Sequence, residues 1–248
     1  MIKLAVLLKR KRDMSFAAFD EYWLGPHGDL VVSIPEFTRH VRRYSQLHLV
    51  DPDYGGEGMA WGRAAFDGIA EVWFDGIDDM TAAFNEPRFV ELVGADDAKF
   101  IDPAAVSILV TEEFEKIALN GNPEVKLSVA IKRREGMTFA EFDEYWNTAH
   151  ADIVTSVPEF TRYVRRYVQA HLVADYTGDG DSSKLASQWG KAAFDGIAEL
   201  WFDSTADMVS AFNEPRFIEK IAPDDEKFVD AAGTQLLTLR EVQKYPVA

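Results

Sequence analysis

Short apolar runs alternate along this chain with stretches in which aromatic residues recur every three or four positions, and the whole pattern occurs twice. The apolar runs are bounded by charged or turn-forming residues, which is typical of strands. The strands predicted in this way are residues 2–8, 66–74 and 106–114, and again 125–131, 194–202 and 234–242.

The aromatic stretches predict helices. Ser15 and Thr138 stand at N-cap positions, and the aromatic residues that follow them lie on one helical face. Glu141 completes a capping box with Thr138. Pro26 should distort the first of these helices, and Pro35 and Pro158 should end both. Shorter helices are predicted at residues 77–85 and 205–213, each broken by a Glu-Pro-Arg-Phe sequence.

A second strand in each half is predicted over residues 37–50 and 160–173, which are rich in β-branched and aromatic residues. Strict alternation divides it into a mostly apolar face and a polar, aromatic face. The polar face carries His40, Arg42, Tyr44, Gln46 and His48 in the first half, and Tyr163, Arg165, Tyr167, Gln169 and His171 in the second.

The chain is a tandem duplication. Residues 14–50 return as residues 137–173 with 25 of 37 positions identical, and residues 64–75 return as 192–203. We therefore expect one repeat over residues 1–119, a linker at 120–123 and a second repeat over 124–248.

Each repeat has the order strand, helix, strand, strand, helix, strand, which is typical of a ferredoxin-like α+β fold. Such a sheet has helices on one face and leaves the other bare. Packing the two repeats sheet to sheet would cover both bare faces and enclose a cavity lined by the polar face of the second strands. A closed α+β barrel within one chain is therefore predicted, and dimers of the whole chain are possible.

Composition narrows the function classes. The net charge is −16, and no run of 18 apolar residues occurs, so we expect neither nucleic acid nor membrane as the main partner. The first residues lack the features of a signal peptide, and we expect a cytoplasmic protein. The chain has no cysteine, and no two histidines have close metal-ligand spacing. A small organic molecule is the expected partner, and no metal is expected.

The F..YW...H...V pattern, the RYVQ.HLV strand and the FDGIAELWFD strand together resemble the EthD family within the dimeric α+β barrel superfamily, and the resemblance covers nearly all of both repeats. It implies the barrel fold and a small organic substrate. Relatives in the superfamily include cyclases, isomerases, monooxygenases and haem peroxidases, so the resemblance leaves the reaction open.

Two pairs of histidines are the main candidates for chemistry. His48 and His171 share a strand face with Tyr44 and Tyr167, and the set could polarise a carbonyl and move a proton near neutral pH. Alternatively, these histidines are hydrogen-bonded members of the core. His27 and His150 match the helix-one histidine of the resembled family, which implies a place at the cavity, but they could also simply satisfy a helix end.

Other side chains are predicted to bind the substrate or to hold the candidate histidines in place. Gln46 and Gln169 could hold a substrate carbonyl, and Trp73 and Trp201 could stack on a ligand or fill the core. Glu71 and Glu199 could orient a histidine, although pairing with Arg42 and Arg165 is the simpler expectation. Polar, glycine-rich loops or lids are expected over residues 51–63 and 174–191.

Three functions follow as hypotheses. The first is a cofactor-independent lyase or isomerase that acts on an aromatic or carbonyl compound, with His171, Tyr167 and His150 as its acid-base set and Gln169 on the carbonyl. The second is an oxidoreductase, either cofactor-free or with haem on His27 or His150. The third is a non-catalytic binding protein. We further expect unequal sites, because His40 is replaced by Tyr163 and the second loop is longer.

Overall fold

The computed structural model describes residues 1–50, 65–174 and 190–246. Its strands follow one closed order in which neighbours are hydrogen-bonded, β1-β3-β2-β8-β5-β7-β6-β4. The protein is therefore an α+β barrel of eight strands with helices, as predicted. The loops expected over residues 51–63 and 174–191 lie almost wholly outside the described residues.

The two repeats have matching elements. In the first they are β1 (Ile2–Leu8), α1 (Phe16–Tyr22), η1 (Trp23–His27), α2 (Gly28–Val32), α3 (Pro35–Thr38), β2 (Val41–Leu49), β3 (Gly68–Phe74), α4 (Ile77–Phe84), α5 (Pro87–Phe100), η2 (Pro103–Ala105) and β4 (Ser107–Ile117). In the second they are β5 (Val125–Ile131), α6 (Phe139–Tyr145), η3 (Trp146–His150), α7 (Ala151–Thr155), α8 (Pro158–Thr161), β6 (Val164–Leu172), β7 (Gly196–Phe202), α10 (Thr205–Phe212), η4 (Phe217–Ile221), α11 (Ala222–Asp225) and β8 (Gln235–Tyr245).

The local signals at the start of each repeat are confirmed. β1 and β5 occupy the predicted residues. Ser15 accepts a hydrogen bond from the N–H of Ala18, and Thr138 and Glu141 form the complete capping box. These caps satisfy backbone donors that the first helical turn would otherwise leave without partners.

The second strands begin later than predicted. Pro35 and Pro158 do end the preceding helices, but each also starts a short helix, so that the strands start only at Val41 and Val164. Proline suits a first helical turn because its φ is fixed and its missing N–H would have no partner there.

A β-bulge at Arg42 and its counterpart Arg165 changes the faces of these strands. Val41 pairs with Phe74 and Tyr44 with Val72, so Val41 lies on the face of Tyr44 and not on the face of Ser45. The extra residue of a bulge breaks strict alternation. The prediction that His40 and Arg42 share a face with Tyr44 is therefore wrong, whereas alternation holds from Tyr44 to His48.

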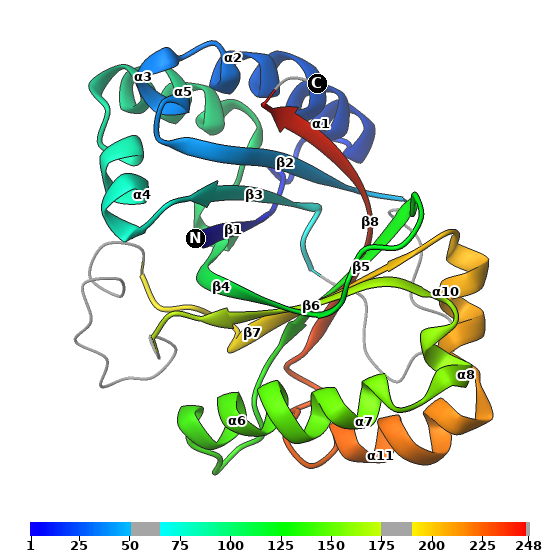
Figure 1. Ribbon diagram of the computed structural model, residues 1–248. Coiled ribbons are helices and arrows are strands. Elements are labelled where there is room, and N and C mark those ends of the chain that lie inside the picture. The colour runs from blue at the N-terminus through cyan, green and yellow to red at the C-terminus, as the bar shows by residue number, and fades with distance from the viewer. Residues whose placement is uncertain (51–64, 175–189, 247–248) are drawn as a thin grey trace. The chain divides into compact units, whose positions relative to one another are not determined.

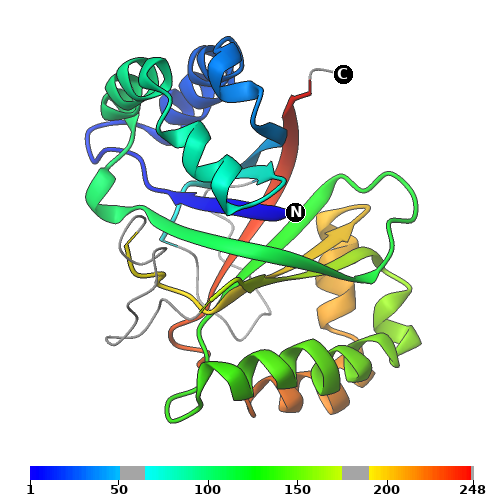
Figure 2. The same ribbon diagram turned by 60° about the vertical axis from the view of Figure 1, so that its left-hand side comes forward.

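Two compact units make up the described chain, and they do not follow the repeats throughout. One unit contains residues 1–50, 65–111 and 241–246, and the other contains residues 112–174 and 190–240. The end of β4, from the first repeat, thus belongs to the second unit, and the end of β8 belongs to the first. Within the second unit, α6, α7, α8, α10 and α11 lie on one side of the strands (Figure 1), and the helices of the first unit lie likewise beside their own strands (Figure 2).

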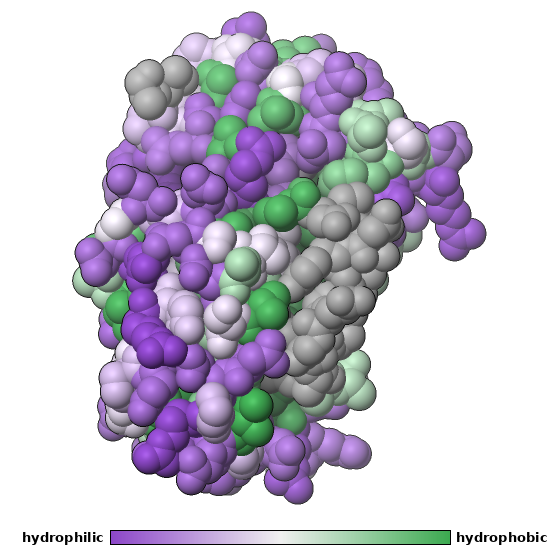
Figure 3. All heavy atoms as spheres, turned by 90° about the vertical axis from the view of Figure 1, so that its right-hand side faces the viewer, coloured by the Kyte–Doolittle hydropathy of each residue, from purple (hydrophilic) through white to green (hydrophobic). Residues whose placement is uncertain are grey.

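The core of each unit lies between its helices and the adjoining face of its sheet. In the second unit, for example, Phe142 and Trp146 from the helices pack with Leu127 and Phe202 from the strands. No helix within the described residues is long and apolar enough to cross a membrane. The molecular face in Figure 3 is largely hydrophilic, with small separated hydrophobic areas, in keeping with the charged composition.

Candidate active site

A π-helical turn positions one candidate histidine in each repeat. In the second repeat, α6 continues through η3 into α7, and the widened turn carries both Trp146 and His150, which are buried. Single π-turns inside helices are frequent at functional sites because they redirect side chains. The first repeat has the same turn, from Trp23 to His27.

Proline does not cause this distortion. Pro26 lies within the turn of the first repeat, but the second repeat has Ala149 at the equivalent position and forms the same π-turn. The two turns share a close contact with the sheet: a Cβ added to Gly196 would lie 2.5 Å from the Trp146 ring, and one added to Gly68 would meet Trp23 at the same distance. Glycine is needed at both positions because the indole lies directly on the strand backbone.

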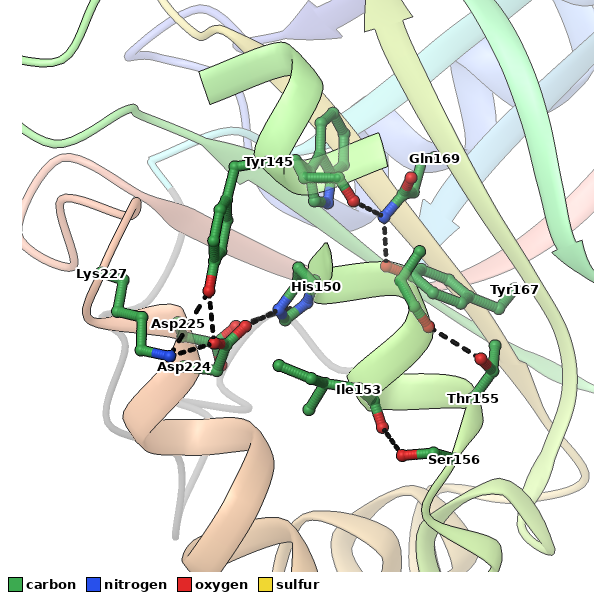
Figure 4. Close-up of polar contacts among 12 residues, drawn as sticks. Tyr145, His150, Ile153, Thr155, Ser156, Tyr167, Gln169, Asp224, Asp225 and Lys227 are labelled. Atoms are coloured by element: carbon green, nitrogen blue, oxygen red, sulfur yellow. Dashed lines mark hydrogen bonds and ion pairs between the residues drawn. The ribbon is translucent and has the colours of Figure 1, made fainter. Parts of the chain in front are cut away.

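His150 is held from one side by an aspartate. Its Nδ1 lies 2.9 Å from Oδ2 of Asp224, and Oδ1 of the same carboxylate accepts hydrogen bonds from the Tyr145 hydroxyl at 2.7 Å and from Lys227 at 2.8 Å (Figure 4). Burial opposes ionisation of Asp224, but the hydrogen bonds from His150, Lys227 and Tyr145 outweigh it and hold the pKa of this carboxyl well below its usual range. A carboxylate at Nδ1 requires a proton there, so the neutral ring has its lone pair on Nε2.

Asp225 lies on the other side of the same ring. Its Oδ1 is 3.6 Å from Nε2 of His150, and its side chain is only 12% exposed. Burial raises the pKa of Asp225 to about 7; the charge of His150 opposes this shift, and those of Asp224 and Glu226 add to it. Near neutral pH this carboxyl can therefore hold or release a proton.

Replacing Asp225 with asparagine should change how stability depends on pH. Because the folded-state pKa is raised, folded protein binds the Asp225 proton more tightly than unfolded protein, and wild type loses stability as pH rises from about 4 to 7. D225N lacks this loss, so its free energy of unfolding relative to wild type should increase by about 2 to 3 kcal/mol between pH 5 and pH 8, as measured by urea denaturation. Burial also raises the pKa of Asp97 to about 7, so the matched variant D97N should show a change of the same sign, but a smaller one, because the Asp97 side chain is 43% exposed and solvent screens it. A difference that does not vary with pH would contradict the buried-acid assignment.

A pocket of about 50 Å³ lies between the helices and the sheet of the second repeat. Aliphatic and aromatic side chains form most of its wall, and the ionisable groups in the wall are His150, Tyr167 and Asp225. The Tyr167 oxygen accepts a hydrogen bond from Gln169 at 2.8 Å, which leaves its own O–H able to donate. Burial raises the pKa of Tyr167, so the phenol stays protonated.

His171 is fully engaged in hydrogen bonds. Its Nδ1 lies 2.6 Å from Asp143 on α6, and its Nε2 lies 3.2 Å from Oε1 of Gln169. The orientation of this amide is fixed, because Nε2 of Gln169 donates to the Trp146 carbonyl. Both ring nitrogens therefore face acceptors, and the ring also stacks on Trp146 at 4.2 Å.

The structure brings His171, Gln169 and Tyr167 together as predicted, but they form a row of hydrogen bonds with one another. Gln169 lies between the other two side chains, as expected, and its amide bonds to both instead of being open to a substrate carbonyl. Tyr167 and His150 border the pocket, and His171 is not among the residues that line it.

The first repeat has the same contacts at equivalent positions. Asp96 accepts hydrogen bonds from Tyr22 and Lys99, and it lies 2.9 Å from Nδ1 of His27. Burial lowers the pKa of His27, and Asp96 opposes this shift.

His48 in the first repeat has the contacts of His171. It lies 2.6 Å from Asp20 and 3.3 Å from Gln46, and Gln46 donates to the Tyr44 hydroxyl and to the Trp23 carbonyl. One feature differs: Asp97 approaches Nδ1 of His27, at 3.8 Å, whereas Asp225 approaches Nε2 of His150.

Four predicted residues lie away from these sites. His40 and Tyr163 contact equivalent partners, Glu86 and Glu214, so their exchange does not explain a difference between the sites. The bulge residues Arg42 and Arg165 turn outward to Asp75 and Asp203.

Glu71 and Glu199 lie on the sheet face opposite the helices and are fully buried. Lys3 pairs with Glu71 and Lys126 with Glu199, so the predicted pairing with Arg42 and Arg165 is wrong. Trp73 and Trp201 share this face, and Arg43 and Arg166 lie over their rings. None of these four side chains lines the pocket of the second repeat.

The acidic residues of the site were not predicted. Asp96 and Asp97 lie on α5, and Asp224 and Asp225 lie on α11, after the proline at which the helical prediction stopped. A signal was present: the pattern Asp-Asp-x-Lys-Phe occurs at residues 96–100 and returns at 224–228.

Comparison with known proteins agrees with this architecture. The sequence profile described as the EthD domain matches residues 11–104 and 134–232. A conidial pigment biosynthesis dehydratase EthD from Metarhizium robertsii is 32% identical over 118 residues, which cover 44% of this chain and 77% of that protein. An anthrone oxidase-like protein of known structure has a TM-score of 0.62 at 9% identity, covering all of this chain and 94% of that one. A protein provisionally named a monooxygenase, from Lactobacillus acidophilus NCFM, has a TM-score of 0.52 at 12% identity, covering 98% and 93% of the two chains.

Haem does not fit at His150. The pocket beside this ring is about 50 Å³, whereas even small-molecule sites are typically about 300 Å³ or larger, and Nε2 of His150 faces the carboxyl of Asp225. The same limit applies to a substrate, of which only the reacting atoms could lie in this pocket.

Proposed function

This chain belongs to the EthD domain family, and from that premise and the geometry of its second repeat we propose that it is a cofactor-independent lyase that removes water from a small carbonyl compound. The observation that carries the proposal is the pair formed by His150 and Asp225 at the wall of a largely apolar pocket. Asp224 holds the His150 imidazole through Nδ1 and so leaves its Nε2 to face Asp225 in the pocket wall. The Asp225 carboxyl has a pKa of about 7. Such groups supply a base and an acid close to neutral pH.

The proposed reaction is the elimination of a β-hydroxyl group. Nε2 of His150 takes the proton from the carbon next to the carbonyl, while the Tyr167 hydroxyl donates a hydrogen bond to the carbonyl oxygen, on which negative charge develops. Asp225 in its protonated form gives its proton to the leaving hydroxyl. The C–O bond breaks, a C=C bond forms and water leaves.

The same contact would restore the starting state. After elimination His150 carries an extra proton and Asp225 is ionised. The Nε2–Oδ1 separation of 3.6 Å allows this proton to return to the carboxyl after a small adjustment. Atoms and charge balance over the cycle without a further reactant. The dehydratase named among the relatives supports water loss as the reaction class.

The direct test uses the full chain and a panel of cyclic and aryl β-hydroxyketones. We expect absorbance of a conjugated enone to appear, and substrate recovered from D2O to carry deuterium next to the carbonyl. Turnover that consumes dioxygen without water loss would overturn the proposal in favour of an oxidoreductase. Tight binding across the panel with neither product nor deuterium would overturn it in favour of a binding protein.

A further inference from the structure

Each repeat's π-turn is contacted by a lysine whose position in the sequence belongs to the other repeat. Lys116 lies near the end of β4, in the first repeat, and its Nζ bonds to the Asn147 carbonyl at 2.7 Å and to the Asn147 side-chain oxygen at 2.6 Å. Lys244 lies at the equivalent place on β8, and its Nζ bonds to the Leu24 carbonyl at 2.9 Å and to Asp29 at 2.9 Å. Asn147 and Leu24 are equivalent positions, three residues before His150 and His27 respectively.

The shared acceptor is a backbone oxygen whose usual helical partner bonds elsewhere. In an α-helix the Asn147 carbonyl would accept from the N–H of Ala151, but that N–H donates to Thr148 instead. Gly28 likewise donates to Gly25 and Trp23 and not to Leu24. Asn147 and Leu24 are partly buried, and a backbone carbonyl that lacks its helical donor needs another partner, which the lysine supplies.

Lys116 is well placed for this contact. It is half buried beside the Phe114 ring, and Phe114 also meets the edge of His171 at 5.0 Å. Burial lowers the pKa of Lys116 and the charge of Asp152 opposes that shift, while both direct acceptors are neutral oxygens. The strand end that carries Phe114 and Lys116 thus packs on two site elements of the second repeat.

We propose that Lys116 is a positioning residue for His150, so that the first repeat fixes the geometry of the second repeat's site. The effect on catalysis rests on the proposed function. Loss of the ammonium would favour return of the π-turn to α-helical bonding. That change removes one residue from the turn, equivalent to a rotation of about 100°, and would move His150 away from Asp224.

The test compares K116M and K116R with wild type, each in the H27N background, so that only the second site contributes. K116M should lower kcat about 10- to 100-fold with little change in KM, and K116R, which keeps the charge and donors, should recover most of the loss. A K116M variant with wild-type kcat, or a loss that K116R does not restore, would overturn the positioning role in catalysis.

A second readout does not depend on turnover. Hydrogen–deuterium exchange in K116M should be at least about fivefold faster over residues 146–151 and unchanged over residues 23–28. K244M should instead make exchange faster over residues 23–28 and leave it unchanged over residues 146–151. If no substrate is turned over by wild type, the proposed function fails while the exchange experiment still tests the contact. Uniform acceleration over both segments would overturn the assignment, because it would report general loss of stability.

Discussion

Replacing His150 with asparagine is expected to lower kcat for water loss about 100- to 10,000-fold, with a much smaller change in KM. The imidazole is the proposed base, and asparagine preserves a polar side chain of similar size that cannot accept the proton at neutral pH. The contact with Asp224 explains why the effect should be large: this carboxylate fixes the ring and places the lone pair on Nε2. Steady-state kinetics on the substrate found in the panel would measure it.

The matched variant H27N tests whether the two sites are equal. His27 has the same contact to its aspartate, but the neighbouring Asp97 is more exposed and lies nearer to Nδ1 than to Nε2. We therefore expect H27N to keep most of the turnover that H150N loses. Equal losses in the two variants would contradict unequal sites, and near wild-type turnover in H150N would contradict the assignment of the base.

Replacing Glu199 with glutamine is expected to reduce the free energy of unfolding by about 3 to 5 kcal/mol. Nζ of Lys126 lies 2.9 Å from Oε1 of Glu199, and neither side chain is more than 1% exposed. Glutamine removes the negative charge that lies next to this buried ammonium, and so weakens the interaction that offsets its desolvation. Urea denaturation at pH 7 would measure the change.

Two further variants separate this effect from loss of packing. E71Q breaks the equivalent pair with Lys3 and should have a similar cost. A double replacement of Lys126 with methionine and Glu199 with leucine removes both charges and should lie much closer to wild type than E199Q does. A loss below about 1 kcal/mol in E199Q would show that the pair is not the compensating interaction.

Periodicity and capping predicted the parts of the fold that depend on local interactions. β1, β5 and both N-caps required only neighbouring residues, and they occur where the sequence indicated. The bulge at Arg42 did not follow from alternation, because one inserted residue reverses the faces on either side of it. The helix α5 was missed because Pro87 was interpreted only as the end of one helix, whereas it is also the first residue of the next.

The candidate site was only half predictable for a related reason. His150 could be placed by helical spacing and by family resemblance, but its partner Asp224 is 74 positions away and reaches it only through folding. His171 had the same apparent chemical potential, yet the contacts to Asp143 and Gln169 occupy both of its nitrogens. Residue type predicts what a side chain can do, and three-dimensional contacts decide whether it is available.

The exchange of strand ends between the repeats also bears on how a duplicated gene can evolve. After most duplications, one copy is free to decay or to acquire a new role while the other is maintained by selection. Here the ends of β4 and β8 each belong to the compact unit formed mainly by the other repeat. Deletion of either repeat would also remove the strand end that completes the compact unit of the other repeat. A substitution on one of these strand ends can likewise be compensated by a change in the opposite repeat. Selection therefore acts on the two copies jointly, and their divergence should proceed by paired substitutions.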